Sequence, residues 1–82
     1  MVTIHRERGL RFVIYTMDHE PVHIHVFGDG EMKVEIRGRD GWPEIVWSIG
    51  TKGGERRRAM DIVLARQTEF LARWREIHGE TS

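Results

Sequence analysis

The sequence predicts an α+β fold: an antiparallel β-meander of four to five strands, followed by one long C-terminal helix packed on one face. Three observations support this fold class. Apolar and polar residues alternate in the first half, glycine-rich turns separate the alternating segments, and apolar residues in the last third recur every three or four positions. With 82 residues, the chain is expected to form a single domain around one small core.

The expected strands follow one another through short connections. Residues 10–16 are rich in β-branched and aromatic types, which favour strands. The sequence Gly28-Asp29-Gly30 is typical of a tight hairpin turn, and the segment after it, 32–37, has the clearest alternation in the chain. The predicted strands are residues 2–6, 10–16, 22–27, 31–37 and 43–49.

The last third predicts one helix over residues 55–78. Its apolar residues form one stripe, and Gly79 is of a type that commonly ends helices. Gln67 lies within this stripe, so we expect its amide to bond to the backbone or to a turn side chain. The side chains expected to pack between sheet and helix are Leu10, Phe12, Ile14, Val22, Ile24, Val26, Val34, Ile36, Ile45 and Trp47.

The composition excludes several classes of function. Thirteen basic and thirteen acidic residues give a formal net charge of zero, which does not favour nucleic acid as a partner. The absence of cysteine excludes disulfides and thiolate metal sites. No apolar run reaches membrane-spanning length, and the N-terminus lacks the apolar core of a signal peptide. We therefore expect a cytoplasmic protein without a membrane partner.

Histidines are concentrated in one stretch, where His19, His23 and His25 occupy seven residues. Pro21 disfavours a helix before it, so the residues from Asp18 to Pro21 are expected to form a turn that leads into the strand. Side chains two apart on a strand point to the same face, with Cα atoms roughly 7 Å apart. We therefore expect His23 and His25 to lie together on the sheet face away from the helix.

One interpretation of this stretch is a metal site. Neutral imidazole is a common ligand for zinc and other divalent transition metals. His23 and His25 would supply two ligands from the strand, and His19 would supply a third from the turn. Asp18 or Glu20 would act as a further ligand or orient a ring from behind.

A second interpretation is a small metal-independent enzyme that resembles an RNase. Histidine titrates near neutral pH and serves as a general acid or base. Arg11 and Arg37 would supply further positive charge for a phosphate. The candidate catalytic residues are His19, His23, His25 and Lys33.

The interpretation that we favour is an interaction or regulatory module. The face away from the helix would carry Tyr15, Phe27 and Glu35, which would contact a small protein partner or a second copy of the chain. Aromatic residues are enriched at interface hot spots, and a small core makes association favourable. The structural alternative is that His23 and His25 are merely polar residues of an open face, worth under about 1 kcal/mol each.

One set of residues, spread over nearly the whole chain, is typical of a known family: Thr3, Ile4, Arg11, Phe12, Tyr15, Asp18, His19, Pro21, His23, His25, Val26 and Trp74. In these residues the chain resembles a small bacterial family catalogued as domain of unknown function 4160. The resemblance implies a partner, because members are often encoded beside another small family of unknown function, number 2442, in an arrangement that looks like a toxin–antitoxin or regulatory pair.

Overall fold

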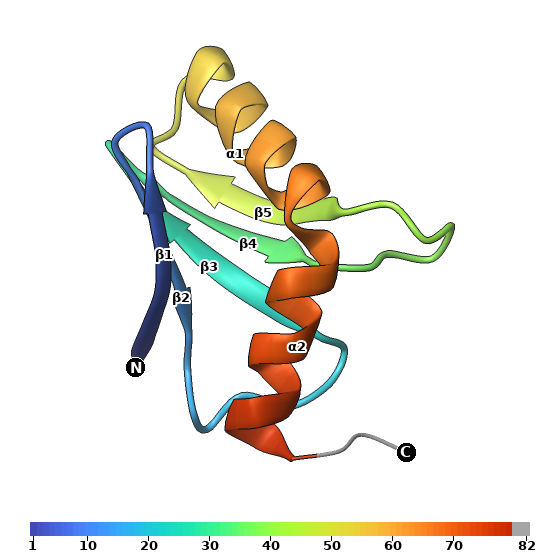
Figure 1. Ribbon diagram of the computed structural model, residues 1–82. Helices are drawn as coiled ribbons and strands as arrows, with labels where there is room; N and C mark the ends of the chain where they lie inside the picture. Colours follow the sequence, from blue (N-terminus) through green and yellow to red (C-terminus); the bar gives the residue numbers. More distant parts are fainter. Residues whose placement is uncertain (80–82) are drawn as a thin grey trace.

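A computed structural model of the chain describes residues 1–79 of the 82. Five strands form one antiparallel sheet in the order β1-β2-β3-β4-β5, as the meander prediction requires. Both helices lie on the same side of this sheet (Figure 1). The elements are β1 (Val2–Glu7), β2 (Leu10–Ile14), β3 (His23–Phe27), β4 (Glu31–Glu35), β5 (Glu44–Ile49), α1 (Gly53–Ala65) and α2 (Gln67–His78).

The core lies between the sheet and the helices. Alternate residues of β2, β3 and β4 turn one face toward the helices, as their period of two predicts. Each large apolar side chain that is fully buried there contributes about 1.5 to 3 kcal/mol relative to an exposed one. The main buried residues of this core are Phe12, Ile14, Ile24, Val26, Met32, Val34, Ile36, Ile62, Val63, Phe70 and Trp74.

The prediction of one continuous helix is wrong, because the helix bends at Arg66. Arg66 has φ −116° and ψ 22°, which separates α1 from α2. Hydrogen bonds continue through the bend, since the N–H of Arg66 donates to Ile62 and the N–H of Phe70 donates to Arg66. The apolar stripe keeps its three-to-four spacing on both sides of Arg66, so the sequence pattern does not indicate the bend.

Side chains at the bend hold it to the sheet. The Gln67 amide Nε2 donates to the carbonyl oxygens of Ile36 and Gly41, at 2.9 and 2.8 Å. This confirms that Gln67 bonds to the backbone from within the apolar stripe. Arg66 bonds to Glu7 of β1 through its Nε. The bend thus occurs where two consecutive side chains reach opposite ends of the sheet.

The prediction that Trp47 packs against the helices is also wrong. Lys33 pairs with Trp47 and the next residue, Val34, pairs with Ile45, so Val46 is an extra residue in β5. Such a β-bulge reverses the alternation that follows it. Ile45 therefore packs on the core, whereas the Trp47 ring lies 5.8 Å from the His25 ring on the opposite face of the sheet.

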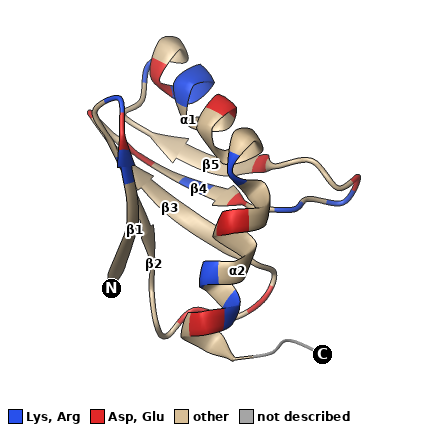
Figure 2. Cartoon of the chain, viewed as in Figure 1, with Lys and Arg blue, Asp and Glu red and all other residues tan. Residues whose placement is uncertain are grey.

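Charged side chains surround this core without separating by sign. Figure 2 shows acidic and basic residues interleaved along both helices and in the connecting loops. Such mixing is typical of a solvated surface rather than of a nucleic-acid footprint. Neither of the two described helices has the length and apolar character needed to cross a membrane.

Candidate functional site

Asp18, His23 and His25 form a group that we call the Asp–His–His cluster. One ligand-type atom from each of the three lies within 4.8 Å of the other two. His23 and His25 share one face of β3, where they pair with Glu35 and Lys33 of β4. Asp18 comes from the β2–β3 loop, in a turn that its own N–H closes by donating to the carbonyl oxygen of Tyr15.

The two imidazole rings direct the same nitrogen toward one carboxylate oxygen. Nε2 of His23 lies 2.8 Å from Oδ2 of Asp18, and Nε2 of His25 lies 3.5 Å from that oxygen. The ring centroids are 5.5 Å apart. The three side chains therefore converge on one small volume, as the ligands of a single ion do.

The opposite nitrogen of each ring faces a hydrogen-bond acceptor. Nδ1 of His23 lies 2.8 Å from the carbonyl oxygen of Pro21, and Nδ1 of His25 lies 3.2 Å from Oε2 of Glu31. A carbonyl or an ionised carboxylate only accepts, so both Nδ1 atoms carry the proton. In the neutral rings both Nε2 atoms then present a lone pair to Asp18.

Burial keeps His25 in the form that presents this lone pair. The side chains of His23, His25 and Asp18 are 5, 12 and 29% exposed. Burial lowers the pKa of His25 below its ordinary value of 6.5, although Glu31 and Asp18 act in the other direction. Burial likewise raises the pKa of Tyr15 above 10.0. Both side chains are therefore favoured in their neutral forms at pH 7.

Aromatic rings enclose the cluster. The Tyr15 ring meets the His25 ring edge-on at 4.5 Å, and Trp47 contacts His25 from the other side of β4. The Trp74 ring lies 5.3 Å from the His23 ring. Asp18, the most exposed of the three ligand-type residues, is the side from which solvent reaches the cluster.

The expected separation of the histidine pair from the helix is wrong for His23. Its ring is buried against Trp74, which belongs to α2. In Figure 1 the C-terminal half of α2 runs on beside the β2–β3 loop, and a cleft is lined jointly by the loop and α2. Trp74 therefore contacts His23 at the start of β3. The period of two within β3 indicates the face of His23 but not this contact with α2.

The structure does not bring His19 into the cluster. His19 is exposed in the β2–β3 loop, and the third ligand-type residue near the two strand histidines is Asp18. The closed turn at Asp18 directs that side chain inward, and the next residue points outward. Lys33 is paired with His25, but among the described residues no hydrogen bond or ion pair joins it to the cluster.

The residues predicted to form an interface are engaged within the fold. Tyr15 packs on His25, the Arg11 guanidinium lies 5.1 Å from the centre of the Phe27 ring, and Glu35 pairs with His23. Their assignment to a partner or homodimer interface stays a prediction.

Glu31 is the site residue that the sequence analysis missed. It orients His25 from behind. It pairs with Phe27 across the hairpin, so it shares the face of His25. The Gly28-Asp29-Gly30 turn places Glu31 opposite Phe27, and the period of two places Phe27 on the face of His25. These two signals in the sequence would have identified Glu31.

Comparison with known proteins identifies one family. A family model described as "Domain of unknown function (DUF4160)" matches residues 9–75, which include the whole cluster and its aromatic walls. No match was found among the curated proteins or among the solved structures.

Proposed function

Because the chain belongs to the DUF4160 family, a domain of unknown function, we propose its function from the geometry: the Asp–His–His cluster binds one divalent transition-metal ion. Zinc is the first candidate. Two imidazole nitrogens and one carboxylate oxygen are common ligands of zinc, and a site with three protein ligands retains a position for water or a further ligand.

One observation carries this proposal. Both Nε2 atoms converge on Oδ2 of Asp18, while both Nδ1 atoms are bonded to Pro21 and Glu31. Histidine ligands of metals typically donate their second ring N–H to a carbonyl or carboxylate, which sets the tautomer and the ring orientation. The cluster therefore has the outer bonds of a metal site as well as its inner ligands.

A metal ion would satisfy all three groups of the cluster, whereas a proton on one ring would satisfy only one of the two contacts with Asp18. The lone pair on Nε2 of a neutral His23 would face a carboxylate oxygen at 2.8 Å. A proton on His23 would relieve that contact, but His25 would still present its own lone pair to the same oxygen. A metal ion between the three groups satisfies all of them at once.

The cluster must adjust to hold an ion, because its three ligand-type atoms lie within 4.8 Å of one another. Ligands of tetrahedral zinc lie roughly 3.3 Å apart, given metal–ligand bonds near 2.0 to 2.1 Å. The 3.5 Å separation between His25 and Asp18 already suits this geometry. The 2.8 Å separation between His23 and Asp18 requires the Asp18 carboxylate to withdraw by roughly 0.5 Å. Asp18 stands on a loop, which makes that movement inexpensive.

The bound metal would fasten the β2–β3 loop to β3, because Asp18 comes from the loop and both histidines come from the strand. We therefore propose a small metal-dependent module rather than an enzyme. The RNase-like alternative is less well supported, since Lys33 makes no polar contact with the cluster among the described residues and His19 stands outside it.

The test is isothermal titration of chelator-treated protein with zinc chloride at pH 7.5. We expect one ion per chain with a dissociation constant of about 1 μM or below. Asp18→Asn, His23→Gln and His25→Gln should each weaken binding at least about tenfold, within the range seen when supporting metal-site groups are lost. Cobalt substitution provides an independent readout, because tetrahedral coordination gives visible absorption bands.

His19→Gln is the matched control, since it removes a neighbouring histidine that lies outside the cluster. It should leave the zinc affinity unchanged. Binding weaker than about 100 μM to the unmodified protein, or equal weakening by His19→Gln, would contradict the proposal.

A further inference from the structure

A second candidate site is formed in part by the β2–β3 loop. A cleft of about 510 Å³ opens there between the loop, the residues after β4, and the outer half of α2. Its volume falls within the range of small-molecule pockets. None of the three cluster residues lines it. The lining residues are Glu20, Pro21, Val22, Arg37, Leu71 and Arg75.

The cleft combines free positive charge with an apolar wall. Arg37 and Arg75 are exposed, and within residues 1–79 neither forms an ion pair or a side-chain hydrogen bond. Leu71 is almost fully buried, and Val22 packs against the core, so the wall between the arginines is held in place by the fold. By contrast, Arg66 and Arg73 each bond to a glutamate of α2 at three residues' separation.

These groups match a particular ligand chemistry. A guanidinium presents paired donors that fit a carboxylate or a phosphate oxygen pair, and its bonds to such anions are charge-assisted. The apolar wall suits a hydrocarbon group attached to the anion. Glu20 adds one negative charge to the rim, so the net charge of the lining is +1 (two arginines against one glutamate), which suits a small anion of low charge.

We propose that this cleft binds a small organic anion, with its carboxylate or phosphate held between Arg37 and Arg75 and its apolar group against Leu71 and Val22. This proposal does not rest on the metal site, because no side chain belongs to both sites. Failure of one proposal therefore leaves the other unaffected.

The test is titration of the isotope-labelled full chain by NMR with two probes, 4-methylpentanoate and isobutyl phosphate. We expect saturable shifts of the Val22 and Leu71 amides, and the probe that binds more tightly identifies the anion as carboxylate or phosphate. Arg37→Gln and Arg75→Gln should each weaken that binding at least about tenfold, because each removes a charge-assisted contact. Glu20→Gln should strengthen it, because it removes the repelling charge.

Arg73→Gln is the matched control, since it makes the same change of charge on the same helix at a residue outside the cleft. It should leave the affinity within about twofold of the unmodified protein. The proposal is overturned if neither probe shifts Val22 or Leu71 up to about 10 mM, or if Arg73→Gln weakens binding as much as Arg75→Gln.

Discussion

Glu55 places a carboxylate inside the protein, at the start of α1. The residue is only 4% exposed, and its Oε2 accepts a hydrogen bond from the Asp29 N–H at 2.5 Å. The chain passes so close that a Cβ at Gly28 would lie 1.9 Å from Oε2 and 2.7 Å from Leu10. A side chain at position 28 would therefore have to displace the ends of the Glu55 and Leu10 side chains, a cost that adds to the turn preference of glycine in the sequence.

We predict that Glu55→Ala lowers the free energy of unfolding by about 1 to 3 kcal/mol, because the Asp29 N–H loses a charged acceptor in a partly buried hydrogen bond. Urea denaturation followed by tryptophan fluorescence measures this change. Gly28→Ala should also destabilise the fold, and the double variant should cost less than the sum, since removal of Glu55 relieves the closest contact. Additive effects would mean that the two residues do not share this contact.

Individual residues also explain why the candidate metal site could be found only in part. The period of two along β3 correctly indicates that His23 and His25 share a face. Whether Asp18 or His19 joins the histidine pair depends on the backbone dihedral angles of the turn, because these angles set where each side chain points. The residue types in the turn do not determine those angles.

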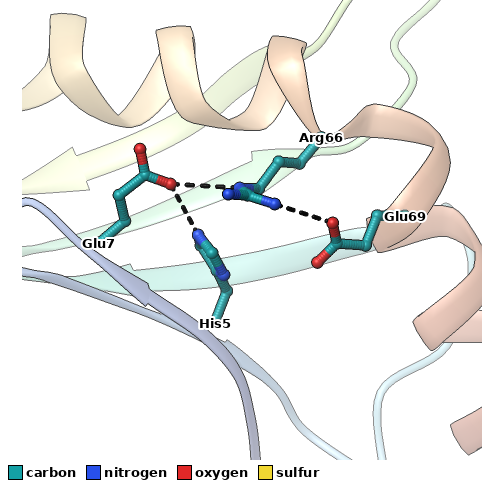
Figure 3. Close-up of polar contacts among 4 residues, drawn as sticks. All are labelled: His5, Glu7, Arg66 and Glu69. Carbon is teal, nitrogen blue, oxygen red and sulfur yellow. Dashed lines mark hydrogen bonds and ion pairs between the residues drawn. The ribbon is translucent and has the colours of Figure 1, made fainter.

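At the scale of elements, β1 is joined to the bend of the helix by a chain of four side chains (Figure 3). Glu7 Oε1 accepts from Nε2 of His5 at 2.7 Å and from Nε of Arg66 at 3.1 Å. Arg66 also bonds to Glu69 at 2.9 Å. The edge strand of the sheet and the junction of α1 with α2 are thereby connected across 59 residues of sequence.

This connection predicts a dependence of stability on pH. The hydrogen bond from His5, followed by that from Arg66, lowers the pKa of Glu7 below 4.5. The folded state thus favours the ionised carboxylate more than the unfolded state does. The resulting stabilisation is fully present above pH 4.5 and is lost as the pH falls through the lower pKa of the folded state.

We therefore expect Glu7→Gln to lower the melting temperature slightly at pH 7 and to have a diminishing effect as the pH falls from 4.5 toward 3. The effect is small because the Glu7 side chain is exposed to water. Thermal unfolding monitored by circular dichroism at several pH values measures it. Glu76→Gln is the control, since its pair with Arg73 lies within α2 and joins no other element. A difference between Glu7→Gln and the unmodified protein that persists at pH 3 would contradict this assignment.

At the scale of the whole molecule, a small core limits stability. The helices cover one face of the sheet, and the cluster lies where the β2–β3 loop meets β3 and Trp74 of α2. A ligand that binds only the folded state stabilises it by mass action. A metal ion that joins the loop to the sheet would therefore contribute a substantial share of the total.

We predict that zinc raises the melting temperature. At a free concentration one hundred times the dissociation constant, the gain is about 2.7 kcal/mol. For a domain of this size, that gain corresponds to roughly 10 to 20 °C. Differential scanning calorimetry with and without zinc measures the shift. His25→Gln should reduce the shift to about half or less and His19→Gln should retain it, whereas a similar shift in both variants would indicate binding elsewhere.

The sequence by itself determined the strands and the two faces of β2, β3 and β4. Alternation along β2, β3 and β4, the Gly28-Asp29-Gly30 hairpin and the stripe from Met60 onward depend on neighbours within a few residues, so the sequence is sufficient to predict them. It therefore predicts four to five strands in a meander, helical structure on one face, and two histidines side by side.

Only the tertiary structure decided how these elements meet. The bulge at Val46 moves Trp47 to the face of His25, the bend at Arg66 divides the helix, and α2 carries Trp74 to His23. Each of these three features depends on packing contacts and hydrogen bonds between residues that are far apart in the chain. A local pattern is compatible with several such arrangements, and the free energy of the whole fold selects one of them.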